Sequence, residues 1–186
     1  MFRRILMMVL FLFVPLQMMK AQSSLWTEVM YRTGDAGDNT QINISASKKF
    51  TPSFGAFVWS ISSKGWGESI VGAVYSPRPW VEFDLGAGLE KNEHPFRTQA
   101  SVWVGNKKGS LYAAVENGGS GFWYVATGNM PVQSNFGIGF RAQRFVGIGP
   151  RFQITKKNIM FWVVPIAWDP ELSGAKNTSV ALRFTP

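Results

Sequence analysis

Alternation of apolar residues with polar or small ones is the feature that most constrains how this chain can fold. In the clearest example, residues 80–90, one face carries Val81, Phe83, Leu85, Ala87 and Leu89. Acidic residues and glycines occupy the positions between them. Because successive side chains of a β-strand point to opposite faces, this period of two predicts a strand with one apolar and one polar face. The sequence after residue 40 contains no comparable helical period.

The same pattern recurs along the chain, most clearly in two neighbouring copies. Residues 136–143 and 146–153 each place Gly, Gly, Arg and Gln on one face and mainly apolar residues on the other. Shorter examples lie at residues 41–47, 97–105 and 179–184. Two such strands in succession, joined at Arg144, predict a β-hairpin.

Clusters of Gly, Pro, Asn and Asp interrupt this pattern at regular intervals and delimit up to twelve segments, typically 8–11 residues long. A tilted membrane-spanning strand needs about 9–11 residues. Several of the breaks are only two or three residues long, which favours antiparallel hairpins. We therefore expect an all-β fold, an antiparallel up-and-down transmembrane β-barrel with twelve strands preferred. Eight to ten strands remain if breaks such as 51–52 and 144 are β-bulges.

One segment, residues 159–168, is apolar on both faces. Met160, Trp162, Val164 and Ile166 alternate with a second set of apolar residues that ends at Ala167. The pattern indicates a strand whose inner face packs against something, or a strand at a subunit contact. Pro165 weakens it as a central strand, because proline cannot donate a ladder hydrogen bond.

The N-terminus has the pattern of a secretory signal peptide. A short basic stretch precedes an apolar run over residues 5–16, and the small residue Ala21 follows. The run is too short for a comfortable transmembrane helix, although an uncleaved anchor is the alternative. We expect residues 1–21 to be the signal peptide and residues 22–186 to form one barrel domain. The absence of cysteine excludes disulfides.

Composition separates a membrane barrel from other classes of exported protein. Aromatic residues make up 15% of the chain and charged residues only 16%, which is low for a soluble domain. The net charge of +8 is too scattered for nucleic acid but is compatible with anionic lipid or an anionic solute. Aromatic residues recur near segment ends, as in membrane girdles: Trp26, Tyr31, Phe54, Trp66, Tyr75, Trp80, Phe96, Phe122, Trp123, Trp168 and Phe184. The alternative is a soluble secreted β-barrel that binds an apolar ligand inside.

Taken together, the leader, the strands of about ten residues and the closing strand with Val180, Leu182 and Phe184 resemble bacterial outer-membrane β-barrel proteins. The resemblance covers the whole mature chain as a pattern and singles out no family. It implies a location in the outer membrane, contact with outer-membrane lipid and insertion by the outer-membrane assembly machinery. In such proteins that machinery reads the last strand and its terminal aromatic, whereas here Thr185 and Pro186 follow Phe184. We expect both termini to face the periplasm.

The polar faces of the predicted strands form the candidate functional site, the barrel lumen. The inward set comprises Glu82, Asp84, Glu90, Arg97, Gln99, Glu116, Arg141, Gln143, Arg151, Gln153 and Arg183. Opposite charges in a narrow interior either pair and fill it or line a water-filled path that selects solutes. We therefore expect a narrow passive channel, porin-like in character, or a structural or surface-interaction protein of the cell envelope. The sequence leaves the oligomeric state open.

The sequence offers little for an enzyme or a bound cofactor. A lipid-modifying barrel enzyme needs a His beside a Ser, and the one histidine, His94, has no such neighbour in its Asn-Glu-His-Pro context. The Asp35, Asp38 and Asn39 positions do not match the ligand spacing of a known calcium loop. We expect no catalytic residue, no cofactor and no metal, with the lipid-modifying enzyme kept as a second alternative.

Overall fold

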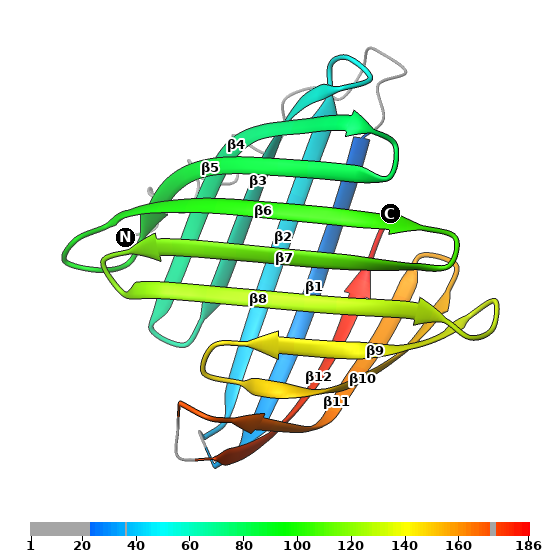
Figure 1. The fold of residues 1–186 in the computed structure, drawn as a ribbon. Helices are drawn as coiled ribbons and strands as arrows, with labels where there is room; N and C mark the ends of the chain where they lie inside the picture. Colours follow the sequence, from blue (N-terminus) through cyan, green and yellow to red (C-terminus); the bar gives the residue numbers. More distant parts are fainter. Residues whose placement is uncertain (1–22, 36, 172–173) are drawn as a thin grey trace.

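The structure, a computed structural model, describes residues 23–35, 37–171 and 174–186. Twelve strands form one closed antiparallel barrel in which each strand pairs with the next and β1 pairs with β12 (Figure 1). This confirms the predicted fold and the preferred strand number. The strands are β1 (Ser23–Gly34), β2 (Asn39–Lys49), β3 (Phe54–Ser63), β4 (Trp66–Arg78), β5 (Val81–Glu90), β6 (Phe96–Asn106), β7 (Gly109–Gly118), β8 (Gly121–Pro131), β9 (Phe136–Gln143), β10 (Gly147–Lys156), β11 (Ile159–Asp169) and β12 (Ala175–Phe184). The predicted signal peptide, residues 1–21, lies outside the described residues.

No helix in the described part of the chain is long and apolar enough to cross a membrane.

The connections between strands are short at both ends of the barrel. We call the end where β1 begins and β12 finishes the terminal end, and the opposite end the distal end. The two breaks that the sequence left as bulges or turns, 51–52 and 144, both lie in turns between paired strands. Phe145 and Lys157 adopt φ angles of 64° and 54° in two short connections, β9–β10 and β10–β11.

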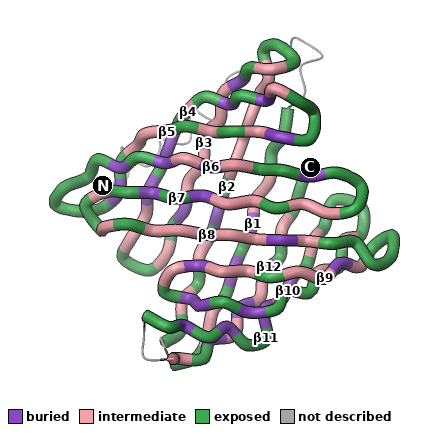
Figure 2. Tube along the Cα trace, viewed as in Figure 1, coloured by how far each residue is buried: buried purple, intermediate pink, exposed green. Residues whose placement is uncertain are grey.

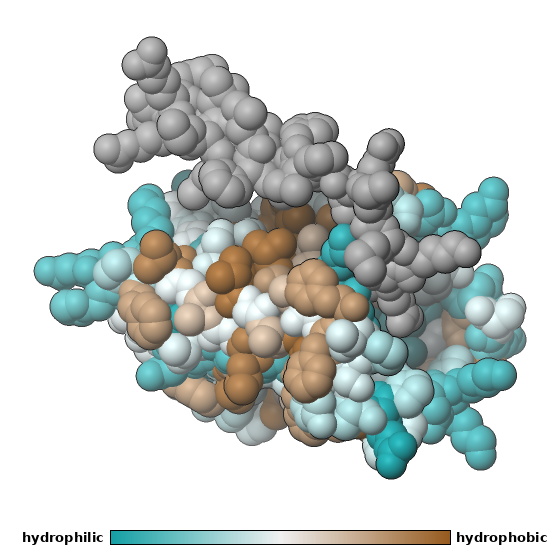
Figure 3. All heavy atoms as spheres, turned by 90° about the horizontal axis from the view of Figure 1, so that it is seen from above, coloured by the Kyte–Doolittle hydropathy of each residue, from teal (hydrophilic) through white to brown (hydrophobic). Residues whose placement is uncertain are grey.

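Apolar side chains point away from the barrel axis. Leu85 and Leu89 are 68% and 62% exposed, while their neighbours Asp84 and Glu90 point inward. Figure 2 shows the same alternation of burial along the strands, and Figure 3 shows apolar side chains gathered midway along one face with hydrophilic ones at both ends. The soluble-barrel alternative placed Val81, Phe83, Leu85, Ala87 and Leu89 in a dry interior. That orientation is wrong for this row, because Phe83, Leu85 and Leu89 are exposed on the outer face, while Val81 is 9% exposed.

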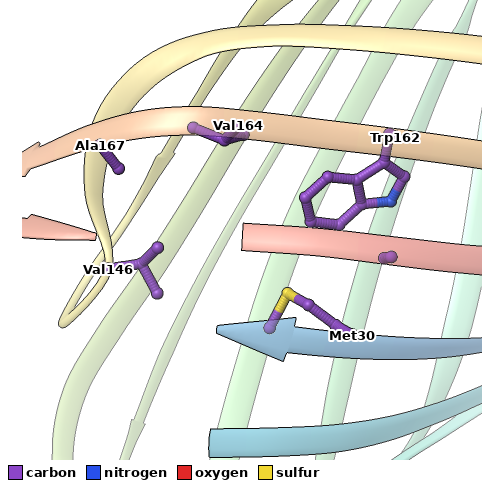
Figure 4. Packing of buried hydrophobic residues seen from close by; sticks show 6 residues of the cluster. Met30, Val146, Trp162, Val164 and Ala167 are labelled. Carbon is purple, nitrogen blue, oxygen red and sulfur yellow. The ribbon is translucent and has the colours of Figure 1, made fainter. Parts of the chain in front are cut away.

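The segment that is apolar on both faces, β11, packs its inner side against a small apolar cluster (Figure 4). Trp162 and Val164 are fully buried there, with Met30, Val146, Ala167 and Ala181. A register shift between Val164 and Ala167 reverses the alternation, so Ile166 is 59% exposed and Ala167 is buried. The period of two had placed Ile166 on the same face as Trp162 and Val164, and the structure separates them because the ladder is irregular at Pro165. At this irregularity the Pro165 carbonyl accepts a hydrogen bond of 2.7 Å from the Thr178 hydroxyl of β12.

Closure of the barrel joins the first and last strands through a buried carboxylate. Glu28 on β1 lies opposite Arg183 on β12 in the strand register. Its Oε2 accepts hydrogen bonds from the Arg183 guanidinium, at 3.0 Å from Nε and 2.8 Å from Nη2, and from Trp162 Nε1 at 2.9 Å. One carboxylate therefore ties β1, β11 and β12 together on the inner side of this seam.

Two glycines make room for an aromatic ring inside the barrel. Gly72 and Gly86 face each other on β4 and β5. A Cβ atom at either position would approach the Phe57 ring to 2.5 Å and 2.8 Å, respectively. The Phe57 ring from β3 thus packs on the backbone of these two glycines, and a larger residue at either position would displace the ring.

Replacing Leu85 with Arg tests the outward orientation of the apolar row. A cation at mid-bilayer depth on the lipid face is expected to lower the free energy of unfolding by about 2–4 kcal/mol. Urea titration of the barrel reconstituted in lipid vesicles measures this change, and Leu85→Phe provides a control that keeps the face apolar. Equal stability of the Arg and Phe variants would contradict contact between this row and lipid.

Replacing Glu28 with Gln tests the seam. The variant keeps an acceptor for Trp162 but loses the ion pair with Arg183, so we expect a loss of about 1.5–3 kcal/mol of unfolding free energy. The same titration measures it, with Glu93→Gln in an exposed distal turn as the control. A loss no larger than that of the control would show that the seam does not depend on this pair.

Candidate functional site

The barrel interior contains two adjoining cavities. The central cavity has a volume of about 470 Å³ and the distal cavity about 320 Å³. Both are lined by the same six residues at their boundary: Met30, Gln41, Trp59, Ile61, Trp123 and Gln143. We call these six the waist, since they lie where one cavity gives way to the other.

The structure places the predicted lumen residues on the inner face. All of them except Glu90 line the two cavities, most of them the central one. Glu90 is also directed inward, but it is buried against Arg97 and contributes to a cluster of charges. The period-two pattern alone was sufficient to sort these side chains to one face.

A cluster around Arg97 occupies the wall near the distal end. The Arg97 Nε lies 2.7 Å from a Glu68 oxygen and 2.8 Å from a Glu116 oxygen, and its Nη1 lies 3.2 Å from Glu90. The Ser120 hydroxyl accepts a bond from Arg97 at 2.7 Å, and its backbone N–H donates to Glu90 at 2.8 Å. One guanidinium thus holds three carboxyl groups from β4, β5 and β7, and all four side chains are at most 2% exposed. Such dense mutual pairing is structural in character.

A second group of charges, on β9 and β10, lacks this pairing. Arg141 donates to the Gln143 side-chain oxygen at 2.7 Å and to the Thr127 hydroxyl at 3.2 Å, and Arg151 donates to the Gln153 side-chain oxygen. The two guanidinium groups lie 4.9 Å and 5.1 Å from the centre of the Trp162 ring. Within the described residues neither arginine forms an ion pair with a carboxylate. Both line the central cavity, so their positive charge is directed at its contents.

Carboxyl groups line the part of the central cavity contributed by β5 and β7. Glu82 pairs with Lys49 at 2.9 Å, and Asp84 accepts a bond of 2.7 Å from the Ser101 hydroxyl. Glu82 and Asp84 lie on β5, whereas Arg141 on β9 and Arg151 on β10 are four and five strands away in the closed ring, so the acidic and basic side chains line different walls of the cavity. The central cavity is therefore bordered by charges of opposite sign on different parts of its wall.

The β9–β10 turn narrows the distal mouth. Its Val146 is only 3% exposed, inside the apolar cluster below the turn, and its backbone carbonyl accepts a bond of 2.9 Å from Asn177. Arg144 pairs with Glu171 in the β11–β12 connection at 3.0 Å and also bonds the carbonyl of Phe122. Arg32 donates to the carbonyl of Phe145. This turn is thus fastened to β1, β8 and the neighbouring connection.

Sequence reasoning missed several inward residues. Glu28, Arg32 and Glu68 line the cavities but were not in the predicted set. For Glu28 and Arg32 the sequence contained the evidence, because residues 26, 28, 30 and 32 alternate along one strand and so share a face. The apolar residues Trp26 and Met30 on that face made it look like an outward one. Trp26, Trp66 and Trp123 were predicted at the membrane interface and instead line the cavities, a correction that follows from the same alternation.

The residues considered for chemistry lie in distal turns. His94 is exposed, and its backbone N–H donates to the Asn92 side chain. Asp35 accepts a bond from the Lys176 backbone and Asp38 from the Thr33 hydroxyl, so both carboxylates serve the β1–β2 turn. Among the described residues, no group of three or more His, Asp or Glu side chains is arranged to hold a metal ion.

The fold is shared with porins of known structure. No family model and no characterised protein matches the sequence. A solved KdgM porin superposes with a TM-score of 0.58 at 12% identity, covering 86% of this chain and 98% of its own. The outer membrane protein Omp33 of Acinetobacter baumannii gives 0.53 at 8%, covering 88% and 97%, and a NanC porin gives 0.51 at 10%, covering 86% and 97%. The chain therefore has the fold of small bacterial outer-membrane barrels, as its sequence pattern suggested.

Proposed function

We propose that this protein is a narrow passive channel of the bacterial outer membrane for small polar solutes. The observation that carries the proposal is the pair Arg141 and Arg151, which face the central cavity without carboxylate partners. A charge in a dry protein interior is costly unless it is paired. Arginines bonded only to neutral groups are stable where water and mobile ions reach them, so they indicate a solvated path.

The size of the interior supports the same function. A cavity of about 470 Å³ is within the range that accommodates a small molecule. Twelve strands enclose more space than the eight of the smallest barrels, whose interiors side chains fill. The waist, with two tryptophans and Ile61, limits the path to small solutes.

The basic and the acidic side chains lie on different parts of the cavity wall, so they would attract different groups of a solute. Arg141 and Arg151 would attract an anionic group, and the wall with Glu82 and Asp84 would attract a cationic one. Location in the outer membrane is part of this proposal, supported by the outward apolar row, the expected leader and the shared fold. One of the fold neighbours is described as a KdgM porin in complex with disordered oligogalacturonate, an example of a barrel of this fold with a bound solute.

The second candidate is a closed structural or surface-interaction barrel. The Arg97 cluster and the fastened β9–β10 turn favour it, because both fill or cover the distal end. Single-channel recording separates the two candidates, since a closed barrel carries no ionic current in a planar bilayer.

Removing the unpaired arginines is expected to change ion selectivity. Two unit charges at about 10 Å in water interact by roughly 0.4 kcal/mol, which is a factor of about two for each ion. Each removed cation disfavours anions and favours cations by that factor, so it should lower the anion-to-cation permeability ratio about fourfold. The reversal potential of the Arg141→Gln/Arg151→Gln variant in a KCl gradient measures this. Asp84→Asn should shift the reversal potential in the opposite direction. Lys64→Gln, in the β3–β4 turn of the distal end, should leave the reversal potential unchanged. Absence of current through the unaltered barrel would overturn the proposal itself.

Trimming the waist is expected to raise conductance. Trp123 lines both cavities, so Trp123→Ala should widen the boundary between them and increase single-channel current. Trp168→Ala is the matched control, because Trp168 is 54% exposed on the outer face. The same conductance in both variants would place the limiting constriction elsewhere.

A further inference from the structure

Cations are gathered at one end of the barrel. Apart from Lys49, which pairs with Glu82, six lie in or beside the turns of the terminal end: Lys48, Arg78, Lys107, Lys108, Lys156 and Lys157. We call this set the basic collar. It is distributed around the rim, on β2, β4, the β6–β7 turn and the β10–β11 turn. Lys48 is half-buried and the other five are exposed.

The basic collar has no acidic counterpart within the structure. None of the five turns at the terminal end contains Asp or Glu, and none of the six cations forms an ion pair within the described residues. The neighbouring Lys49 points inward to Glu82 instead. The six distal turns differ, because they contain four carboxylates, Asp35, Asp38, Glu93 and Glu171, against Lys64, Lys91 and Arg144. The excess of positive charge therefore belongs to the terminal end alone.

The strand register places two collar lysines on the outer face of the barrel. On β2, Lys48 shares the outward side with Ile44 and Ala46, one step further toward the rim. On β10, Lys156 continues the exposed row of Phe152 and Ile154. Exposed aromatics of the same end, Phe50 and Trp80, mark the border of the apolar belt. The side chains of Lys48 and Lys156 therefore lie at the border of the apolar belt, where the hydrocarbon of a membrane would meet the headgroup region.

We propose that the basic collar binds the phosphate groups of anionic phospholipids. Long lysine side chains on a lipid-facing row extend to the phosphate level of the membrane. Lys107, Lys108 and Lys157 lie in the turns, but Lys48 and Lys156 stand on the outer wall beneath them, where a soluble partner that approaches the turns would not reach. The spread around the rim predicts several headgroups at once. This proposal does not depend on whether the lumen conducts.

Native mass spectrometry of the detergent-solubilised barrel, purified from cells expressing the full chain, tests the proposal. The probes are dioleoyl phosphatidylglycerol and dioleoyl phosphatidylcholine at equal concentration, which share acyl chains and differ in headgroup charge. We expect more phosphatidylglycerol bound, with each removed contacting cation lowering that preference by up to about fivefold. Raising the salt concentration should weaken the preference.

Two variants distinguish the collar from the general charge of the protein. Lys107→Gln/Lys156→Gln should lower the preference for phosphatidylglycerol, while the matched pair Lys64→Gln/Lys91→Gln at the distal end should leave it unchanged. Heat-dependent gel migration checks that both variants are folded, and Lys107→Gln alone serves if the double variant is not. The proposal is overturned if the unaltered barrel binds both lipids equally, or if the distal pair lowers the preference as much as the collar pair.

Discussion

Every backbone N–H and C=O group in a membrane-spanning sheet needs a partner within the protein, because hydrocarbon offers none. The rest of this structure depends on that requirement. Eleven of the pairings are between strands that follow one another in the sequence, and the twelfth, β1 with β12, removes the two edges that remain. Once the sheet is closed, each strand presents one face outward and the other to the interior, which divides the side chains into two sets.

The inner set then has to satisfy its own polar groups. Near the distal end Arg97 pairs with three carboxyl groups, although one oxygen each of Glu68 and Glu116 has no hydrogen-bond partner. Along β9 and β10 it does so with neutral amides and hydroxyls, which leaves the charge of Arg141 and Arg151 uncompensated. The two alternatives weighed from the sequence, paired filling and solvated lining, thus describe different parts of one interior.

Much of this architecture could be predicted from the sequence, because period two and turn residues are local signals. The alternation in residues 80–90 and the repeated Gly, Gly, Arg, Gln pattern located β5, β9 and β10 and sorted their side chains. The parts that sequence reasoning missed depend on three-dimensional neighbours. Trp26 and Trp123 line the interior, although their residue type favoured the membrane interface. The bulge at Pro165 put Ile166 on the opposite face from Trp162 and Val164, with which the period of two had grouped it. Which charges pair across the barrel depends on the strand register, and no local pattern contains that information.

The seam has a consequence for the order of folding. Neighbouring strands can pair as soon as a hairpin has formed, but Glu28 and Arg183 are 155 residues apart in the chain. Loop-closure entropy and slow non-local pairing therefore concentrate in one step, the meeting of β1 and β12. Until then the sheet has two open edges that can pair with other chains. Trp162, whose indole donates to Glu28 across 134 residues, would report the moment of closure through its fluorescence, since its surroundings are complete only when the last strand has met the first.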